Sequence, residues 1–410
     1  MNKTQWHTVG VCLASVLALC VLRYGSIEGL PWYGPYLYCL WGILVYLCAP
    51  VMDSRLSLVL SALLLRGLCV GAPLVWSDDL YRYLWEGKLV LLGGNPFVDA
   101  PSHFAIVDGV REFVNHPDIS TVYPPLSQGF FAVMAWLWYD PMVVQICSGL
   151  ADVGTTLAIW TWLKRHNHSV KNAWLYALHP LPILETAWSG HIESVAVCCM
   201  AWGMLGYSTW GKWFWFVGGW CKLFPWVFLG FIRKWTVFEV IGMMVLSVLC
   251  IGYFWEDGAL NGLNTYARHW SYNASLYSIA TWVFGTWGRQ LCLVAMVLST
   301  GFHWWMWLKK QYSIDRILYG LGMTFILCSP TVHPWYALWI VVPMLMMARS
   351  IPQFTWGLWM SLVPLTYVSL FTLDPQTGDW SPPLWPTFLS YLLPCLLWTL
   401  LHFRSSNQRA

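Results

Sequence analysis

Long apolar segments recur from one end of the chain to the other, and they restrict the fold more than any other feature. Examples span residues 9–22, 56–75, 143–163, 237–254, 291–308, 354–373 and 388–401. An apolar run of about 20 residues is long enough to cross the roughly 30 Å hydrocarbon core of a bilayer as a helix. Only 10% of the 410 residues are charged, whereas a soluble domain carries about a quarter. Lipid is therefore the expected solvent of this chain.

The same runs decide between the two architectures that span membranes. In hydrocarbon every backbone polar group must be satisfied within the protein, which leaves helices and closed barrels. Barrel strands alternate apolar and polar side chains, and the runs show no such alternation. The sequence therefore predicts an all-α polytopic membrane protein, with residues 1–410 as a single membrane domain of about 11 to 13 transmembrane helices.

Basic residues at the ends of the runs indicate how the chain is oriented. They form the groups Lys164/Arg165/Lys171, Arg233/Lys234, Lys309/Lys310/Arg316 and Arg404/Arg409. Cytoplasmic loops carry an excess of Lys and Arg, so we place these ends in the cytoplasm. Met1–Lys3 is too weakly basic for a signal peptide, and the first run is interpreted as a retained span. The net charge of +3 gives no support for a nucleic-acid partner.

One segment of about fifty residues, 76–126, interrupts the hydrophobicity and holds seven acidic residues. It is unusually long for a connection between spans. Three spans, near 6–24, 35–50 and 56–75, precede it, so a cytoplasmic N-terminus places this loop on the extracytoplasmic side. It is the predicted location of the chemistry.

Three further polar segments fall on the same outer face when the chain is traced back from the basic loops: 255–275, 329–335 and 374–386. Residues 130–138 are too short for a clear span. We interpret them as a segment that dips into the membrane, because a full span there would conflict with a cytoplasmic position of the basic loop 164–171.

The outer loop begins with a dense group of ionisable residues in the run SDDLYRYLWEG, residues 77–87. If the chain is helical from Asp79 onward, Arg82 and Glu86 lie on the same face as that carboxylate. The glycines of the following GGNPF end this helix. A carboxylate held by a guanidinium can act as a general base on a sugar hydroxyl. The alternative is a solvated, charged start of a loop.

The chain here resembles a known family. The runs SDDLYRYLWEGKLVLLGGNPF and NHPDISTVYPPLSQ are similar to the first outer loop of bacterial GT-C glycosyltransferases, in particular the polyprenol-phosphate-mannose-dependent α-mannosyltransferases. The likeness continues in SGHIESVAV (189–197), in 222–225 and in SPTVHPWYALW (329–339), and so covers roughly residues 50–350. The first-loop motif is specific, and the later ones gain weight from their order. The family has Asp-Gly where this chain has Glu86–Gly87.

The resemblance implies a reaction and a general base. A β-linked polyprenyl-phosphate sugar is attacked by a hydroxyl of a glycan or glycolipid acceptor on the outer face, with inversion at the sugar. Asp79 fits the family's Asp-x-Tyr pattern for the base, and Asp78 is the second choice. Mannose is the best guess for the sugar. The resemblance also implies no metal, no cofactor and a bacterial cytoplasmic membrane, although an endoplasmic reticulum would present the same geometry to its lumen.

A lipid-phosphate leaving group needs cations or proton donors, and Arg and Lys bind phosphate well. The candidates are Arg82, Lys222, Arg268 and His333. Lys222 lies in the apolar run 213–232, which Gly and Pro residues divide into a predicted broken hairpin with Lys222 near its tip. A Lys in such a run is a functional hypothesis by default. The alternative is a snorkelling side chain near a helix end.

A further set of residues is predicted to bind the substrates: Glu86, His116, Tyr123, His191, Glu193 and Tyr336. For His191 and Glu193 the alternative is a structural hydrogen bond at the start of a span. His116 and Tyr123 have the alternative of folding the loop, and Tyr336 that of an ordinary interfacial aromatic. His179, before Pro180, is predicted to be a satisfied core residue.

Two other functions remain open at this point. A transporter or flippase of lipid-linked sugars predicts paired broken spans in two related halves and ionisable residues near the midplane. In this chain the acidic residues gather in one outer loop, which favours an enzyme over a transporter. A polymerase or ligase of lipid-linked oligosaccharides differs from the favoured function only in its donor.

Overall fold

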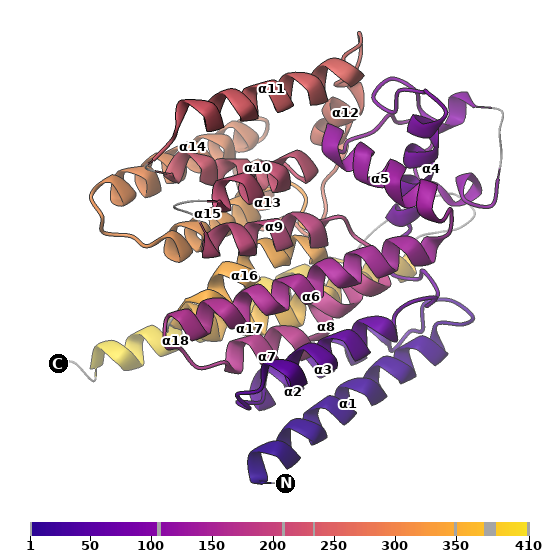
Figure 1. The fold of residues 1–410 in the computed structure, drawn as a ribbon. Coiled ribbons are helices and arrows are strands. Elements are labelled where there is room, and N and C mark those ends of the chain that lie inside the picture. The colour runs from indigo at the N-terminus through magenta and orange to yellow at the C-terminus, as the bar shows by residue number, and fades with distance from the viewer. Residues whose placement is uncertain are drawn as a thin grey trace. The chain divides into compact units, whose positions relative to one another are not determined.

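The computed structural model describes residues 2–104, 108–206, 210–232, 234–347, 351–372 and 383–407. Throughout these ranges the chain forms helices joined by turns and loops (Figure 1). The only β-type contact within them is an isolated bridge between Tyr272 and Thr331. The prediction of an all-α protein is therefore confirmed. Arg233, Arg409, the side chain of Arg404 and most of segment 374–386 lie outside the described residues.

Four helices in the described ranges are long and apolar enough to cross a membrane: α1 (Lys3–Gly25), α6 (Pro141–Arg165), α11 (Val237–Phe254) and α14 (Trp287–Leu308). Their lengths correspond to about 27 to 38 Å, which matches a hydrocarbon core of roughly 30 Å. Only 11% of the apolar window of α11 and of α14 is buried, against 61% for α6. These helices indicate a multi-pass membrane protein. The larger total of about 11 to 13 spans stays a prediction.

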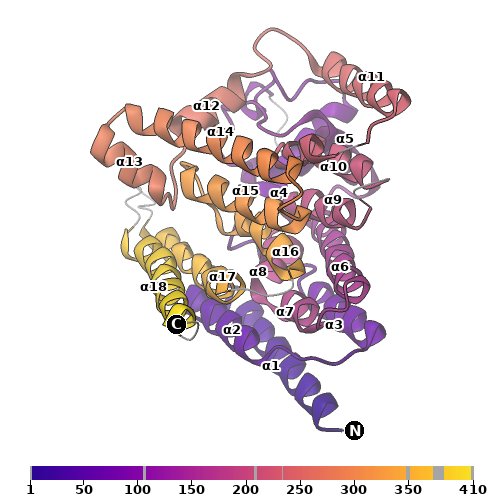
Figure 2. The same ribbon diagram turned by 90° about the vertical axis from the view of Figure 1, so that its left-hand side faces the viewer.

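The chain forms two compact units, and the first comprises Met1–Leu68, Ile159–Glu185 and Ser271–Ala410. Its further elements are α2 (Gly34–Cys48), α3 (Arg55–Gly67), α7 (Lys171–Leu178), α8 (Pro180–Pro182), α13 (Leu276–Phe284), α15 (Ile314–Cys328), η5 (Pro334–Ala337), α16 (Leu338–Met346), α17 (Ile351–Leu362), η6 (Val363–Thr372) and α18 (Trp385–Asn407). Within this unit α17 packs against both α2 and α18 (Figure 2).

The interior of the first unit contains a carboxylate held by two tyrosines. The hydroxyls of Tyr38 and Tyr367 each donate a hydrogen bond of 2.8 Å to Glu185, one to each carboxylate oxygen. Glu185 is fully buried, so these bonds replace the water that its carboxylate loses on folding. His179 is buried as well, and its ring bonds the Ser361 hydroxyl at 2.9 Å and accepts from a backbone N–H. The prediction that His179 is a satisfied core residue is confirmed.

The second unit comprises Cys69–Ala158 and Thr186–Trp270. Its elements are α4 (Asp79–Leu91), η1 (Pro101–His103), η2 (Arg111–Phe113), α5 (Pro125–Leu137), α9 (Glu193–Leu205), α10 (Gly211–Cys221), η4 (Phe224–Phe231), α11 and α12 (Asn261–His269). Helix α6 and the π-helix η3 (Ile183–Trp188) each continue from one unit into the other. This division concerns packing, and the single membrane domain stays a prediction.

Helix α4 begins at Asp79, so the condition on which the sequence analysis places Arg82 and Glu86 on one face is met. Asp79 in its first turn and Lys88 in its last complement the helix dipole. Gly93 follows the helix with a φ of +84°, a conformation that favours glycine, so the predicted glycine turn is confirmed. Helix α4 packs against α5 (Figure 1), and a Cβ at Gly87 would lie 2.2 Å from the carbonyl oxygen of Phe131. Glycine at position 87 therefore permits this close approach.

Two apolar runs are longer than the helices they form. The run 56–75 is helical over α3 but not beyond Leu68. The run 354–373 divides into α17 and the 3-10 helix η6, and Pro364, which has no backbone N–H to donate, stands at the division. Helix α5 has 13 residues, or about 20 Å. The interpretation that residues 130–138 dip into the membrane stays a prediction.

Candidate active site

The two aspartates of the SDD run lie where the chain enters α4, and one amide joins them. The Asn115 side-chain nitrogen donates to Oδ1 of Asp78 at 2.7 Å and to Oδ1 of Asp79 at 3.1 Å. The second oxygen of Asp79 accepts a long hydrogen bond of 3.4 Å from the Tyr123 hydroxyl and lies 3.6 Å from Nδ1 of His191. The Asp79 side chain is 21% exposed. The structure thus brings the partly accessible carboxylate of Asp79 together with three other predicted site residues, Asp78, Tyr123 and His191.

The surroundings shift the proton affinities of several groups in this cluster. The neighbouring protein displaces water from the Asp78 carboxyl, and the charge of Asp79 adds to this, so that the pKa of Asp78 rises to about 6. Burial, and then the nearby Lys222, lowers the pKa of His191 well below its usual range. Burial, followed by the charge of Asp79, raises the pKa of Tyr123 well above the ordinary value. His191 is therefore neutral and Tyr123 protonated at neutral pH.

A buried ion pair lies against the same tyrosine. Lys222 Nζ is 2.8 Å from Oε1 of Glu193, whose side chain is 1% exposed, whereas that of Lys222 is 21% exposed. The ammonium also lies 4.8 Å from the centre of the Tyr123 ring, a cation–π distance. Helix α10 ends at Cys221 and η4 begins two residues after Lys222. The predicted break at Lys222 is therefore confirmed.

Arg82 does not contact Asp79 in the way the helical spacing suggests. Its guanidinium pairs with Glu86 at 3.3 Å and donates to Oδ1 of Asn115 at 3.4 Å. It also donates to the backbone carbonyls of Asn115, His116 and Ile119. Only 6% of Arg82 is exposed. The donors of Arg82 are thus directed to the loop that it holds in place, and its predicted contact with the donor phosphate stays a prediction.

Glu86 is a buried residue whose two oxygens are held within the protein. Its second oxygen accepts hydrogen bonds of 2.8 Å from the Thr121 hydroxyl and the Gln128 amide. Only 2% of Glu86 is exposed, and burial raises the pKa of this carboxyl against the opposing effect of Arg82. Its oxygens stabilise the structure around Arg82, and the predicted contact of Glu86 with substrate stays a prediction.

His116 and Arg268 are both exposed residues near Trp270, the first through a ring contact and the second in the sequence. His116 adopts a φ of +44°, and its ring packs edge-on against Trp270 at 4.8 Å. The surrounding protein, and then the charge of Arg82, lower the pKa of His116. Arg268 is exposed on α12, two residues before Trp270. Their roles in binding substrate and phosphate stay predictions.

His333 and Tyr336 belong to the first unit, where they are part of an aromatic group. The His333 ring stacks on Trp335 at 4.3 Å and on Tyr272 at 5.0 Å. Tyr336 meets the same imidazole edge-on at 5.6 Å. Half-buried rings of this kind can pack against a sugar or a lipid chain. The predicted contacts of His333 with phosphate and of Tyr336 with substrate stay predictions.

Sequence reasoning gave no role to Asn115, the residue that joins the two aspartates, or to Thr121 and Gln128, which hold Glu86. All three lie in the run NHPDISTVYPPLSQ, which the sequence analysis singled out only as a motif. Asparagine beside His-Pro was the available signal. Its contacts depend on how the loop folds back on α4, which no local pattern reveals.

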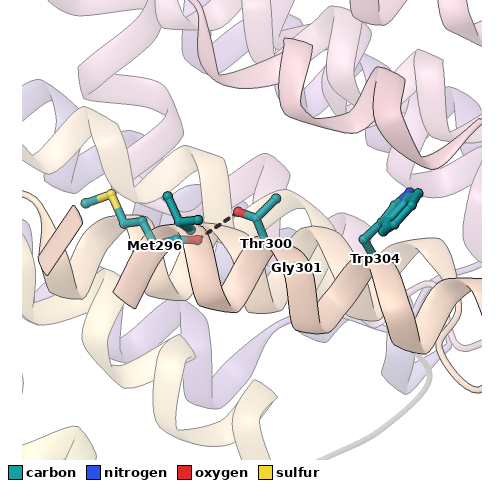
Figure 3. Close-up of a pocket in the computed structure, with 5 residues that line it drawn as sticks. Met296, Thr300, Gly301 and Trp304 are labelled. Carbon is teal, nitrogen blue, oxygen red and sulfur yellow. Dashed lines mark hydrogen bonds between the residues drawn. The ribbon is translucent and has the colours of Figure 1, made fainter. Parts of the chain in front are cut away.

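Other places in the described part of the chain are less suited to chemistry. No three His, Cys, Asp or Glu side chains gather there in a way that would hold a metal ion. An open hollow on α14 is lined by Met296, Val297, Thr300, Gly301 and Trp304 (Figure 3). The Thr300 hydroxyl donates to the backbone carbonyl of Met296 at 2.8 Å. This hollow has no ionisable lining residue, so it offers neither a base nor a phosphate ligand.

Comparisons of the chain with profiles of known protein families, with curated proteins and with solved structures found no match. The functional argument therefore begins with the side chains of the second unit. They provide a partly accessible carboxylate, a neutral imidazole, a protonated phenol and a lysine with its counter-ion. Such a group can accept a proton from an alcohol and can donate hydrogen bonds to an anion.

Proposed function

We propose that the protein is a membrane glycosyltransferase that moves a hexose from a polyprenyl-phosphate carrier to a hydroxyl of a glycan or glycolipid acceptor. The observation that carries the proposal is the geometry of Asp79. One of its oxygens is held by an amide, while the other faces the longer contacts with Tyr123 and His191. A partly exposed carboxylate of this kind is suited to general-base catalysis.

The proposed reaction is a single displacement at the anomeric carbon. Asp79 takes the proton of the acceptor hydroxyl, and the acceptor oxygen forms a bond to C1 of the sugar. The bond between C1 and the phosphate oxygen breaks, and its electron pair leaves with the polyprenyl phosphate. Attack from the side opposite the phosphate inverts the configuration. No other residue has to form a covalent bond.

Lys222 is the proposed ligand of the departing phosphate. It contacts Tyr123, whose hydroxyl is bonded to Asp79, so the cation belongs to the same cluster as the base. Part of its side chain remains exposed. Glu193 holds the ammonium in place and keeps the cluster from carrying an uncompensated positive charge before the donor binds.

We further propose a GT-C-like bundle of about 11 to 13 spans. Support comes from apolar helices of 10 to 17 residues that accompany the four long ones: Gly34–Cys48, Pro125–Leu137, Glu193–Leu205, Pro334–Met346, Gly357–Thr372 and Trp385–Leu397. The resemblance of the first outer loop to mannosyltransferases supports mannose as the sugar and the extracytoplasmic face of a bacterial cytoplasmic membrane as the location.

The test is consumption of defined donors by the purified protein in lipid nanodiscs. A panel of polyprenyl-phosphate mannose, glucose and galactose is offered with a glycan acceptor, and the anomeric configuration of the product is read by NMR. We expect one donor to be consumed and an inverted linkage to form. Movement of labelled lipid-linked sugar across vesicles without a transfer product would instead identify a flippase. Consumption of lipid-linked oligosaccharides alone would identify a polymerase or ligase.

A further inference from the structure

The orientation of the Asn115 amide follows from its neighbour. Arg82 has five N–H donors and no acceptor, and its Nε donates to the side-chain oxygen of Asn115. The amide oxygen must therefore face the guanidinium, which leaves both N–H groups of the amide for the carboxylates. The two hydrogen bonds to Asp78 and Asp79 occupy them. The positions of the oxygen and the nitrogen in the Asn115 side chain therefore follow from the donors and acceptors around them.

The guanidinium itself is held from the interior. Its other four N–H groups have four acceptors: Oε1 of Glu86 and the carbonyls of Asn115, His116 and Ile119. Glu86 is in turn held by Thr121 and Gln128. All five N–H groups of Arg82 and both oxygens of Glu86 are paired, and such buried pairing favours one arrangement of these two side chains. This network ends at the aspartates, of which Asp78 is exposed and Asp79 is partly exposed.

We propose that Asn115 is a positioning residue, whose amide holds Oδ1 of Asp78 and of Asp79 so that Oδ2 of Asp79 is the oxygen that takes the proton of the acceptor. This inference rests on the proposed function. Among the residues that the structure describes, Oδ2 has only the longer contacts with Tyr123 and His191, so an incoming hydroxyl can approach it. Oδ1, bonded to the amide, is the less basic oxygen of the pair.

The amide also favours the ionised form of the Asp78 carboxyl group. An N–H donor stabilises the charged form of a carboxylate, so the Asn115 bond lowers the pKa of Asp78 against the raising effects of burial and of Asp79. The other titratable or charged groups around the pair come from five parts of the chain: Tyr81, Arg82 and Tyr83 in α4, His116 and Tyr123 in the loop, Asp140, His191 with Glu193, and Lys222. Loss of both N–H donors favours the protonated form, and the acid limb of activity moves to higher pH.

The experiment compares three single substitutions in nanodiscs. Asn115→Ala removes both donors, and Asn115→Asp keeps the shape but replaces the donors with a third carboxylate. Asn95→Ala is the matched control, because this asparagine lies in the same loop but donates to the Phe254 carbonyl and to Glu256. We expect kcat to fall by about 10- to 100-fold in Asn115→Ala, less than the loss of a general base itself, with KM changed by less than about threefold.

The pH–rate profile separates positioning from a merely structural role. We expect the acid limb to move to higher pH in Asn115→Ala, further in Asn115→Asp, and not at all in Asn95→Ala. An unchanged acid limb in both Asn115 variants, with only a loss of folded protein, would overturn the inference.

A second readout does not depend on sugar transfer. Infrared absorption of protonated carboxyl groups follows the titration of Asp78, which Asp78→Asn identifies by its absence. The pKa of Asp78, about 6 in this structure, is expected to increase in Asn115→Ala. If the wild-type protein transfers no sugar but this titration shifts, the proposed function is wrong while the amide clamp on the carboxylates stands. If transfer occurs but the titration is the same in all variants, the clamp is wrong.

Discussion

Asp79 and Glu185 both accept hydrogen bonds from tyrosine hydroxyls, but the two carboxylates differ in exposure and in how tightly they are held. Glu185 is fully buried, and each of its oxygens receives one tyrosine hydroxyl at 2.8 Å. Asp79 is 21% exposed, its tyrosine bond is 3.4 Å long, and its remaining neighbours are an amide and an imidazole. Glu185 is arranged for stability, whereas Asp79 retains an oxygen for which a substrate can compete.

The difference follows from where each carboxylate lies in its unit. Glu185 belongs to the π-helix η3, and its partners Tyr38 and Tyr367 come from α2 and η6, far apart in the sequence. Asp79 begins a helix whose first turn meets a long polar loop. A helix start keeps a carboxylate near solvent and stabilises its charge through the dipole. The position of Glu185 suits a structural role, and the position of Asp79 suits a catalytic role.

The largest expected effect is the loss of transfer in Asp79→Asn. The amide cannot accept a proton at neutral pH, so we expect kcat to fall by about 10²–10⁴-fold. Thermal unfolding in detergent should change little, since Asn keeps the shape and can still accept from Asn115. Asp118→Asn, an exposed acid of the same loop, is the control and should keep full activity. Equal turnover by Asp79→Asn and the wild type would remove Asp79 from the mechanism.

The ion pair beside Tyr123 is expected to show the next largest effect. Glu193→Gln leaves the Lys222 ammonium with a neutral partner, and loss of one member of a buried pair costs about 3 kcal/mol of unfolding free energy. The double variant Glu193→Gln/Lys222→Met should recover part of this stability but not activity, because the phosphate ligand is missing. Recovery of both by the double variant would show that Lys222 does not bind phosphate.

Glu185→Gln is expected to destabilise the first unit without a specific effect on the chemistry. One tyrosine hydroxyl then faces an N–H group, and a buried group left without its partner costs about 1 to 3 kcal/mol. The measurement is chemical unfolding in detergent, with kcat determined at a temperature where the variant is folded. Tyr367→Phe, which removes one donor, is the matched control and should cost less. A change in the pH–rate profile of folded Glu185→Gln would contradict a purely structural role for Glu185.

The smallest expected effect concerns Asp78 and pH. Its pKa is raised to about 6, so the folded state binds the proton more strongly than the unfolded chain does. This contribution stabilises the fold at low pH and is lost as the pH rises through the interval from about 4 to 6. Asp78→Asn should therefore raise the melting temperature at pH 8 and leave it nearly unchanged at pH 4. A decrease at pH 8 would show that the charge of Asp78 stabilises the site.

Local features of the site followed from the sequence, and long-range partners did not. The glycine turn at Gly93 and the break at Lys222 each depend on a few neighbouring residues. The loop contacts of Arg82 could not be predicted in this way, because spacing on a helix shows which residues share a face but not which loop returns to that face. Glu185 was not predicted at all, since its tyrosines are separated from it by 147 and 182 positions.

The central claim is that the carboxylate of Asp79 accepts the acceptor's proton, and chemical rescue of Asp79→Ala tests it most directly. This variant leaves space for a small carboxylic acid beside Asn115 and Tyr123. We predict that transfer from the polyprenyl-phosphate sugar is nearly abolished in Asp79→Ala and partly restored by added formate, with no such gain in Asn115→Ala. Wild-type turnover by Asp79→Ala in the absence of formate would contradict the account.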